Sequence, residues 1–262
     1  MNNQAKIIAV VNQKGGVGKT TTSINLATAM AAIDKKVLLI DLDPQGNAST
    51  GVGFPMNARN LTTYDLLTLQ TPIEKIIKKT AIPNLDVIVA TVDLSGAELE
   101  LINRKEREYI LKLRTNPIIY NYDYIFIDCP PSLSILTINA LVMSNSVLIP
   151  LQCEFFALEG LSHLLKTINL VQKRLNPDLT IDGVLLTMYD RRYNLTTQVE
   201  DDVRNNLGSL VFNTVIPRNV RISEAPSHGK PIMLYDTKCA GSLAYIELVK
   251  EFLVRSQRRK SI

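Results

Sequence analysis

The sequence has few cysteines, and their spacing forms no structural framework. Cys129, Cys153 and Cys239 are widely separated and include no C-x-x-C pair. An odd, scattered set argues against disulfide pairing and matches neither zinc nor iron–sulfur spacing. We interpret all three cysteines as reduced packing residues.

Long apolar runs and a secretory leader are also lacking. No apolar run approaches the roughly 18 residues that a membrane-spanning helix needs. The first six residues, MNNQAK, are polar, and no leader with a small-residue cleavage site follows them. With 46% hydrophobic and 21% charged residues, the composition is that of an ordinary globular protein. We therefore expect a cytoplasmic protein.

The positive charge is unevenly distributed. The net charge is +4. Residues 187–262 hold 12 Lys or Arg against 8 Asp or Glu, whereas residues 1–186 hold 17 of each kind. The basic excess therefore lies in the last third of the chain, where a polyanionic partner is most plausibly bound.

Short apolar runs alternate with helix-like stretches along the chain. The predicted strands are residues 6–11, 37–40, 85–90, 124–127, 147–150 and 181–187, and the predicted helices are residues 20–33, 96–113, 133–143, 158–175, 196–207 and 243–254. Strands that are apolar throughout are typical of parallel sheets buried on both faces. The pattern predicts an α/β, doubly wound, mostly parallel sheet with helices on both faces. Without repeats or a low-complexity linker, residues 1–262 are interpreted as one domain.

The segment NQKGGVGKTTT, residues 12–22, lies between the first predicted strand and the first predicted helix. Glycines allow a tight turn in which backbone N–H groups converge on phosphate oxygens, and the positive end of the following helix adds to the attraction. Lys19 is expected to reach the β- and γ-phosphates of a nucleotide, and the Thr20 hydroxyl to bind Mg²⁺. The other residues expected to contact the nucleotide in this segment are Lys14, Gly15, Gly16, Val17, Gly18 and Thr21.

Position 13 is glutamine where the ordinary G-x-x-x-x-G-K-[ST] pattern has glycine, and Lys14 begins the variant K-G-G-x-G-K-T. In this variant the chain resembles the deviant Walker A ATPases, and most of all the ParA/Soj chromosome-partitioning ATPases. The resemblance extends from Lys6 to about Val254. It implies that Lys14 crosses a dimer interface and touches the phosphates of the partner's ATP. A cation supplied in this way neutralises charge in the transition state and links dimerisation to bound ATP.

Carboxylates follow two of the predicted strands. VLLIDLDPQGN ends its strand with Asp41 and Asp43, and YIFIDCPPS ends with Asp128. The resemblance implies that Asp43 orients or activates the attacking water and that Asp128 is the Walker B aspartate, which holds Mg²⁺. Asp41 is a helper near the metal or a residue that caps a turn, and the sequence leaves both open.

The last third contains a second long motif, IPRNVRISEAPSHGKPI, residues 216–232. The resemblance implies that Pro217 and Asn219 contact the adenine base, with Met188 as a weaker candidate for the same pocket. It also implies that Arg192 and Arg221 bind DNA without sequence preference, with Arg191 and Arg218 beside them. Contacts between arginine and phosphate give affinity that depends on salt but reads no sequence.

The resemblance as a whole implies a slow, partner-stimulated ATPase that uses ATP and Mg²⁺. It further implies that an ATP-bound homodimer binds double-stranded DNA of the nucleoid and that a ParB/Spo0J-type centromere-binding protein triggers hydrolysis. The alternative is a membrane-recruited positioning ATPase of the MinD kind, for which the apolar and basic tail, residues 251–260, is the candidate anchor. A metal-cluster carrier is disfavoured by the cysteine spacing. A ligase that shares the loop remains open.

Overall fold

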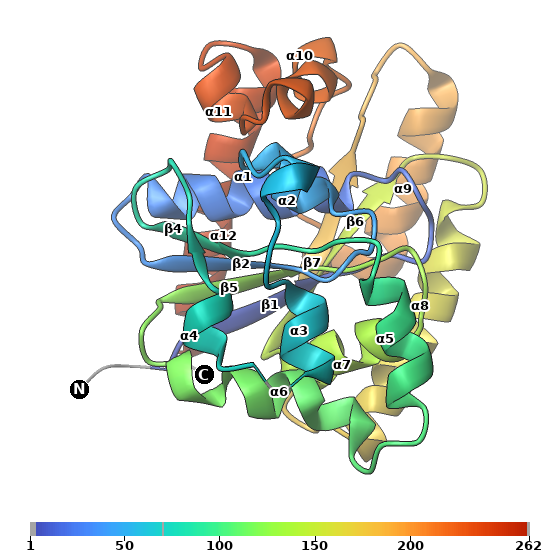
Figure 1. The fold of residues 1–262 in the computed structure, drawn as a ribbon. Helices are drawn as coiled ribbons and strands as arrows, with labels where there is room; N and C mark the ends of the chain where they lie inside the picture. Colours follow the sequence, from blue (N-terminus) through green and yellow to red (C-terminus); the bar gives the residue numbers. More distant parts are fainter. Residues whose placement is uncertain (1–3, 70, 261–262) are drawn as a thin grey trace.

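The computed structural model describes residues 4–69 and 71–260 and shows a seven-stranded sheet in the order β3-β4-β2-β5-β1-β6-β7 (Figure 1). Among the described residues, the strands β1, β2, β4, β5, β6 and β7 pair with one another in parallel. The short strand β3 pairs with β4 in the antiparallel direction. The strands are β1 (Lys6–Val10), β2 (Val37–Asp41), β3 (Lys78–Lys79), β4 (Leu85–Ile88), β5 (Tyr124–Asp128), β6 (Ser146–Gln152) and β7 (Thr180–Thr187). The predicted α/β fold with a mostly parallel sheet is confirmed.

Each face of the sheet packs against its own layer of helices (Figure 1). One face is covered by α3 (Thr63–Thr68), α4 (Ile73–Ile76), α5 (Leu94–Leu101), α6 (Ile110–Thr115), α7 (Ile135–Met143), α8 (Ala157–Arg174) and α9 (Asn194–Leu207). The other is covered by α1 (Lys19–Ala31), α2 (Asn47–Gly51), α11 (Ile232–Tyr235) and α12 (Ala240–Lys260). The short helix α10 (Val220–Glu224) and the 3-10 turns η1 (Met56–Ala58), η2 (Arg107–Tyr109), η3 (Asn116–Ile118), η4 (Gly208–Leu210) and η5 (Ala225–His228) complete the described helices.

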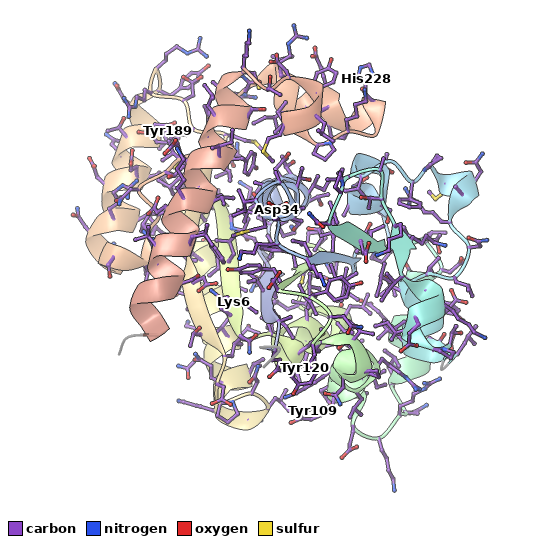
Figure 2. The ribbon with its side chains drawn as sticks, turned by 90° about the vertical axis from the view of Figure 1, so that its left-hand side faces the viewer. Lys6, Asp34, Tyr109, Tyr120, Tyr189 and His228 are labelled. Carbon is purple, nitrogen blue, oxygen red and sulfur yellow. The ribbon has the colours of Figure 1, made fainter. Side chains whose placement is uncertain are left out.

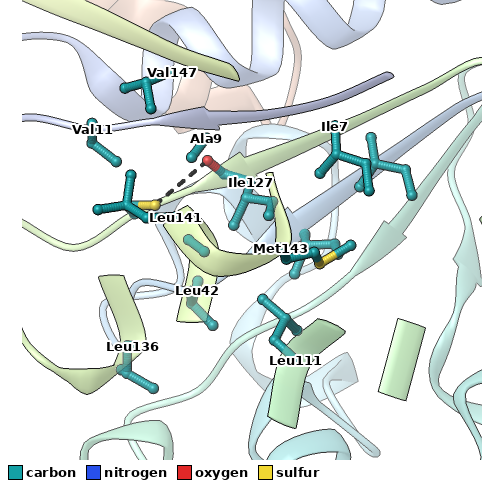
Figure 3. Packing of buried hydrophobic residues seen from close by; sticks show 14 of the residues in the cluster. Ile7, Ala9, Val11, Leu42, Leu111, Ile127, Leu136, Leu141, Met143 and Val147 are labelled. Carbon is teal, nitrogen blue, oxygen red and sulfur yellow. Dashed lines mark hydrogen bonds between the residues drawn. The ribbon is translucent and has the colours of Figure 1, made fainter. Parts of the chain in front are cut away.

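The two layers explain why the strands are apolar at every position. In β1, Ile7 and Ala9 belong to one buried cluster, while Ile8 and Val10 belong to the other. Successive side chains of a strand point to opposite faces, so both sets must be apolar. Figure 3 shows the first cluster, where residues of β1 and β5 meet Leu141 and its neighbours on α7.

The single helix predicted for residues 96–113 is wrong. The structure has α5 and α6 there, separated by a turn in which Glu106 has a φ of 52°. This left-handed conformation interrupts helical hydrogen bonding, and the Arg107 side chain donates to the Ile102 carbonyl inside the turn. The polar run NRKER, residues 103–107, supplies no apolar side chain to hold a continuous helix against the sheet.

The parallel strands bring their carboxyl ends to one edge of the sheet. In the register of the sheet, Asp128 at the end of β5 lies beside both Val10 of β1 and Asp41 of β2. Lys6, at the start of β1, lies toward the amino ends of the strands, and Tyr189, just past the end of β7, lies toward their carboxyl ends (Figure 2). Ligands of open α/β sheets bind at the carboxyl edge, so the loops after β1, β2, β5, β6 and β7 form the candidate site.

The last helix is longer than the sequence predicted. The prediction ended at residue 254, whereas α12 extends to Lys260. The side chains of residues 257–260, in the candidate basic anchor, lie outside the described part of the structure. Among residues 4–69 and 71–260, none of the helices combines the length and the apolarity that crossing a membrane requires.

Candidate nucleotide-binding site

The loop between β1 and α1 forms an open cradle on a fixed base. Gly16 and Gly18 have φ values of 73° and 85°, a region that side chains other than glycine rarely adopt. A Cβ atom added at Gly15 or Gly16 would meet nothing within 4 Å, so the top of the loop is open. Below it, Val17 is buried and its carbonyl accepts a hydrogen bond of 2.8 Å from Thr187 of β7. The α1 amides that follow Gly18 receive no side-chain cap. This geometry suits an anion.

The Lys19 side chain folds back over this loop. Its Nζ donates to the Lys14 carbonyl at 3.0 Å, and the residue is only 7% exposed. Burial lowers the pKa of Lys19, while the nearby charge of Asp128 acts in the opposite direction. An ammonium group enclosed beside a ring of backbone amides is well placed to hold several phosphate oxygens.

Asp128 is fully buried at the end of β5, close to the start of α1. Ser23 donates to its Oδ1 at 2.9 Å, whereas its Oδ2 has no hydrogen-bond partner among the described residues. Burial raises the pKa of Asp128, and the charge of Asp41 raises it further. An unpaired buried carboxylate oxygen is costly unless a cation or its water completes it. The hydroxyl of Thr20 lowers the pKa of the same Asp128 carboxyl group. Asp128 and Thr20 together fit a hydrated Mg²⁺.

The two aspartates after β2 have different surroundings. The Asp41 carboxylate accepts hydrogen bonds from the backbone N–H of Ser49 at 2.8 Å and its hydroxyl at 2.6 Å, which tie β2 to α2. Burial raises the pKa of Asp41. Asp43 is 7% exposed, accepts from the Gln45 N–H at 2.9 Å, and lies among the charges that act on Lys19. Asp41 thus has a role within the fold, while Asp43 belongs to the open site.

Lys14 is exposed and pairs with a residue of another loop, whereas Lys19 is buried at the cradle. Its Nζ forms an ion pair with the carboxylate of Glu154, in the turn after β6, and both side chains are nearly half exposed. The Lys14 N–H is held at 3.0 Å by the Asn12 side chain, which itself donates to the Pro150 carbonyl at 2.7 Å. The two lysines of one loop therefore have different partners and different exposure.

A hollow of about 540 Å³ adjoins the cradle. It brings together the predicted residues Thr21, Met188, Pro217 and Asn219, and Gly18 also lines it. The Asn219 Oδ1 is buried and makes no hydrogen bond within the described chain. The unpaired amide oxygen suits an N–H donor such as an amino group on a base. The volume of the hollow is in the range of ligand pockets.

Three of the four predicted DNA-binding arginines surround a second hollow, of about 490 Å³. Arg191, Arg192 and Arg218 line it, and Pro217 and Arg218 also line the first hollow. Arg192 forms an ion pair with Asp190 at 2.5 Å. Arg221 lies in α10, where it pairs with Glu224 at 2.9 Å, and it does not line this hollow.

Sequence reasoning missed three side chains of the site: Glu154, Ser23 and Ser49. Ser23 lies four residues after Lys19 in α1, and this helical spacing is a signal that the sequence offered. Glu154 gave none, because it is 140 residues from Lys14.

Comparison with known proteins gives consistent results. The family model described as AAA domain matches residues 5–181. The chain is 54% identical over 261 residues to the chromosome partitioning protein ParA of Caulobacter vibrioides, covering 99% of this chain and 98% of that protein. It is 57% identical over 246 residues to the sporulation initiation inhibitor protein Soj of Bacillus subtilis, covering 94% and 97%.

A solved structure with a similar fold is that of cobyrinic acid a,c-diamide synthase from Mycobacterium smegmatis, with bound ATP analog and magnesium. It is 34% identical, with a TM-score of 0.84, and the match covers 97% of this chain and 96% of that one.

Proposed function

The chain belongs to the ParA/Soj family of chromosome-partitioning ATPases, and from this premise we propose that it is an ATP-dependent dimerising switch that binds DNA. The observation that carries the proposal is the division of labour between two lysines of one loop. Lys19 is enclosed over its own cradle, whereas Lys14 is exposed and faces outward. An exposed lysine in a half-exposed ion pair can reach the nucleotide of another subunit at little cost.

ATP and Mg²⁺ are the cofactors, and the residues present fit both. The open loop at Gly15 and Gly16, the unpaired Oδ2 of Asp128 and the unpaired Oδ1 of Asn219 each offer what a nucleotide with its metal needs. Bound ATP supplies the phosphoanhydride bond that is hydrolysed, and Mg²⁺ offsets the charge of the phosphates.

Each group of residues has its own task in this proposal. Lys19 and the loop amides hold the phosphates, while Thr20 and Asp128 hold the metal. Asp43 positions or activates the attacking water. Pro217 and Asn219, with Met188 beside them, hold the base.

Lys14 completes the site of a second copy of the chain. Because two facing triphosphates repel each other, a lysine contributed by each subunit favours a dimer only when nucleotide is present. To reach the nucleotide of the other subunit, Lys14 must break its ion pair with Glu154. This pair is exposed, so its loss costs little free energy. The proposed active form is therefore an ATP-bound homodimer.

The arginines of the last third are the proposed DNA contacts. Arg191, Arg192 and Arg218 gather around one hollow, and a dimer presents this surface twice. Arg192 and Arg221 exchange their acidic partners for DNA phosphates in this scheme. The result is salt-dependent binding to nucleoid DNA in the cytoplasm, released when a ParB/Spo0J-type protein stimulates the slow hydrolysis.

The proposal is tested by measuring retention of plain duplex DNA with a non-hydrolysable ATP analogue, with ADP and without nucleotide. Wild-type protein is expected to retain DNA only with the analogue, and Lys14→Ala is expected to lose this retention. Equal binding in all three states would rule out the switch. Liposome co-sedimentation that requires ATP, without DNA retention, would instead indicate the membrane-recruited alternative.

A further inference from the structure

Arg59 is buried in the loop that carries Asp43. This loop leaves the sheet after β2, passes through α2 and η1, and reaches Arg59 directly after η1. Arg59 is only 9% exposed, although arginine is rarely buried this deeply unless its guanidinium is paired. The groups that pair with the guanidinium therefore indicate what the residue does.

The guanidinium of Arg59 joins separate parts of the chain. Nε and Nη2 donate to the Phe54 carbonyl at 3.0 and 2.8 Å, and Nη2 also donates to the Thr50 hydroxyl at 2.6 Å. Nη1 donates to the Ala90 carbonyl, just past β4, at 2.9 Å. These three acceptors are neutral, so the contacts depend on the fixed directions of the arginine donors rather than on an opposite charge. The guanidinium thus fastens α2 and the turn after it to the end of β4.

Gly46, the residue before α2, lies directly against this guanidinium. A Cβ atom added at Gly46 would overlap Nη1 of Arg59 and would lie 2.8 Å from the Ala90 carbonyl oxygen. Gly46 also has a φ of 64°, in the left-handed region that favours glycine. The main chain at Gly46 is therefore packed closely against both Arg59 and Ala90.

The turn at Gly46 also fixes Asp43. The Gly46 N–H donates to the Asp43 carbonyl at 2.9 Å, and the Asp43 Oδ1 accepts a hydrogen bond from the Gln45 N–H at 2.9 Å. Only two steps separate Arg59 from Asp43: the guanidinium packs against Gly46, and Gly46 is bonded to Asp43. The position of the Asp43 carboxylate thus depends on the buried arginine.

The loop has a second attachment, through Ser49 instead of Arg59. The Ser49 hydroxyl donates to the Asp41 carboxylate at 2.6 Å and accepts a hydrogen bond from the Ala90 N–H at 3.0 Å. These bonds keep α2 at the ends of β2 and β4. Removal of the guanidinium is therefore expected to loosen the turn at Gly46 and to leave the fold of the loop in place.

We propose that Arg59 is a positioning residue for ATP hydrolysis, which holds the turn at Gly46 against Ala90 and so sets where the Asp43 carboxylate stands. The inference rests on the proposed function, in which Asp43 positions or activates the attacking water. Catalysis is sensitive to such placement, since a shift of about 1 Å can slow a reaction on the order of 100-fold.

The test measures single-turnover ATP hydrolysis at saturating ATP and Mg²⁺. Arg59→Ala is expected to be slower by on the order of 30-fold because the Asp43 turn is no longer held. Arg59→Lys keeps the charge but lacks the fork of donors that reaches both Thr50 and Ala90, so its rate should fall on the order of tenfold. The matched control is Arg104→Ala, because Arg104 is partly buried and donates to the Leu67 and Thr68 carbonyls. The rate of this control should stay within about twofold of wild type.

Two further measurements separate positioning from a general role in the fold. Affinity for a fluorescent ATP analogue, and dimerisation with a non-hydrolysable analogue, should stay within about threefold of wild type in both Arg59 variants, since only the hydrolysis step depends on the placement of Asp43. Loss of binding or dimerisation in step with the rate, or equal slowing of Arg104→Ala, would overturn the inference. So would unchanged hydrolysis by Arg59→Ala, or by Arg59→Lys if the alanine variant does not fold.

The role of Asp43 is checked separately in the same assay. Asp43→Ala is expected to hydrolyse ATP more slowly than Arg59→Ala, because it removes the carboxylate itself. Hydrolysis by Asp43→Ala at the wild-type rate would overturn the part of the proposed function that assigns the attacking water to Asp43. Normal hydrolysis by the Arg59 variants, with a slow Asp43→Ala, would overturn the inference alone and leave the proposed function standing.

Discussion

The Nζ of Lys14 pairs with the carboxylate of Glu154, so the exposed lysine of the phosphate loop is held by the turn after β6 and not by its own loop. Lys19, five residues later, bonds to the Lys14 carbonyl inside the cradle. The carbonyl of Lys14 thus accepts the hydrogen bond that holds the Lys19 side chain in the cradle, while the Lys14 side chain lies at the surface. One residue links the cradle to the face where we place the second subunit.

This arrangement predicts that the two lysines can be separated by mutation. Lys14→Ala is expected to change the free energy of unfolding by less than about 0.5 kcal/mol, because an exposed ion pair contributes little. Its monomer should keep its ATP affinity within about threefold, whereas Lys19→Ala should lose on the order of 100-fold because a buried charge-assisted contact is removed. Titration with a fluorescent ATP analogue at concentrations below dimerisation measures both. Equal losses for the two variants would contradict the division of labour.

A second prediction concerns the unpaired oxygen of Asp128. Asp128→Asn removes a fully buried carboxyl group whose ionisation is disfavoured by burial, which raises its pKa, and is expected to stabilise the nucleotide-free protein by about 1–2 kcal/mol. The same change should abolish the gain in ATP affinity that Mg²⁺ gives, because an amide is a poor substitute for a carboxylate beside a cation. Thermal unfolding without nucleotide, and ATP titrations with and without Mg²⁺, provide the two measurements. Asp86→Asn is the control, since Asp86 is also buried but is paired with Lys79. Destabilisation of the Asp128 variant would show that the carboxylate serves the fold.

A third prediction compares Gly183, in the strand β7, with Gly160, in the helix α8, because the space around them differs. A Cβ atom at Gly183, in β7, would lie 2.6 Å from both the Leu210 carbonyl oxygen and the Phe212 ring. Gly183→Ala should therefore destabilise the protein by about 1–3 kcal/mol through overpacking. Gly160, inside α8, has nothing within 4 Å of the same position, so Gly160→Ala should stabilise by about 0.5–1 kcal/mol. Urea unfolding of the nucleotide-free protein measures both, and effects of the same sign would show that this packing is wrong.

The sequence predicted the sheet well because its strands are buried on both faces. Runs such as residues 37–40 are apolar at every position because both of their faces are buried. The two-residue strand β3 gives no such signal, since Lys78 and Lys79 are both polar; besides the backbone pairing with β4, Lys79 forms an ion pair with Asp86. The break between α5 and α6 depends on the left-handed Glu106, which apolar spacing does not reveal.

The phosphate loop was predictable because its chemistry is local: three glycines and a lysine must lie within a few residues. The contacts that surround it are not local. The ion pair between Lys14 and Glu154, and the bonds from Ser49 to Asp41, join residues that only the folded sheet brings together. The acidic partners of Arg192 and Arg221, by contrast, are local: Asp190 lies two residues before Arg192, and Glu224 lies three residues after Arg221.

The last prediction concerns the proposed DNA surface. Arg218 is exposed and lines the hollow that Arg191 and Arg192 share. If each subunit of an ATP-bound dimer places Arg218 on a phosphate, Arg218→Ala removes two contacts. The slope of log affinity against log salt concentration should then fall by about 1.8, at about 0.9 for each phosphate. Arg174→Ala is the control, because Arg174 is an exposed arginine at the far end of α8 and should leave the slope unchanged. Gel-shift titrations on plain duplex DNA at several salt concentrations give the slopes. An unchanged slope for Arg218→Ala would remove this residue from the DNA surface, and an equal fall for both variants would mean that only the overall charge matters.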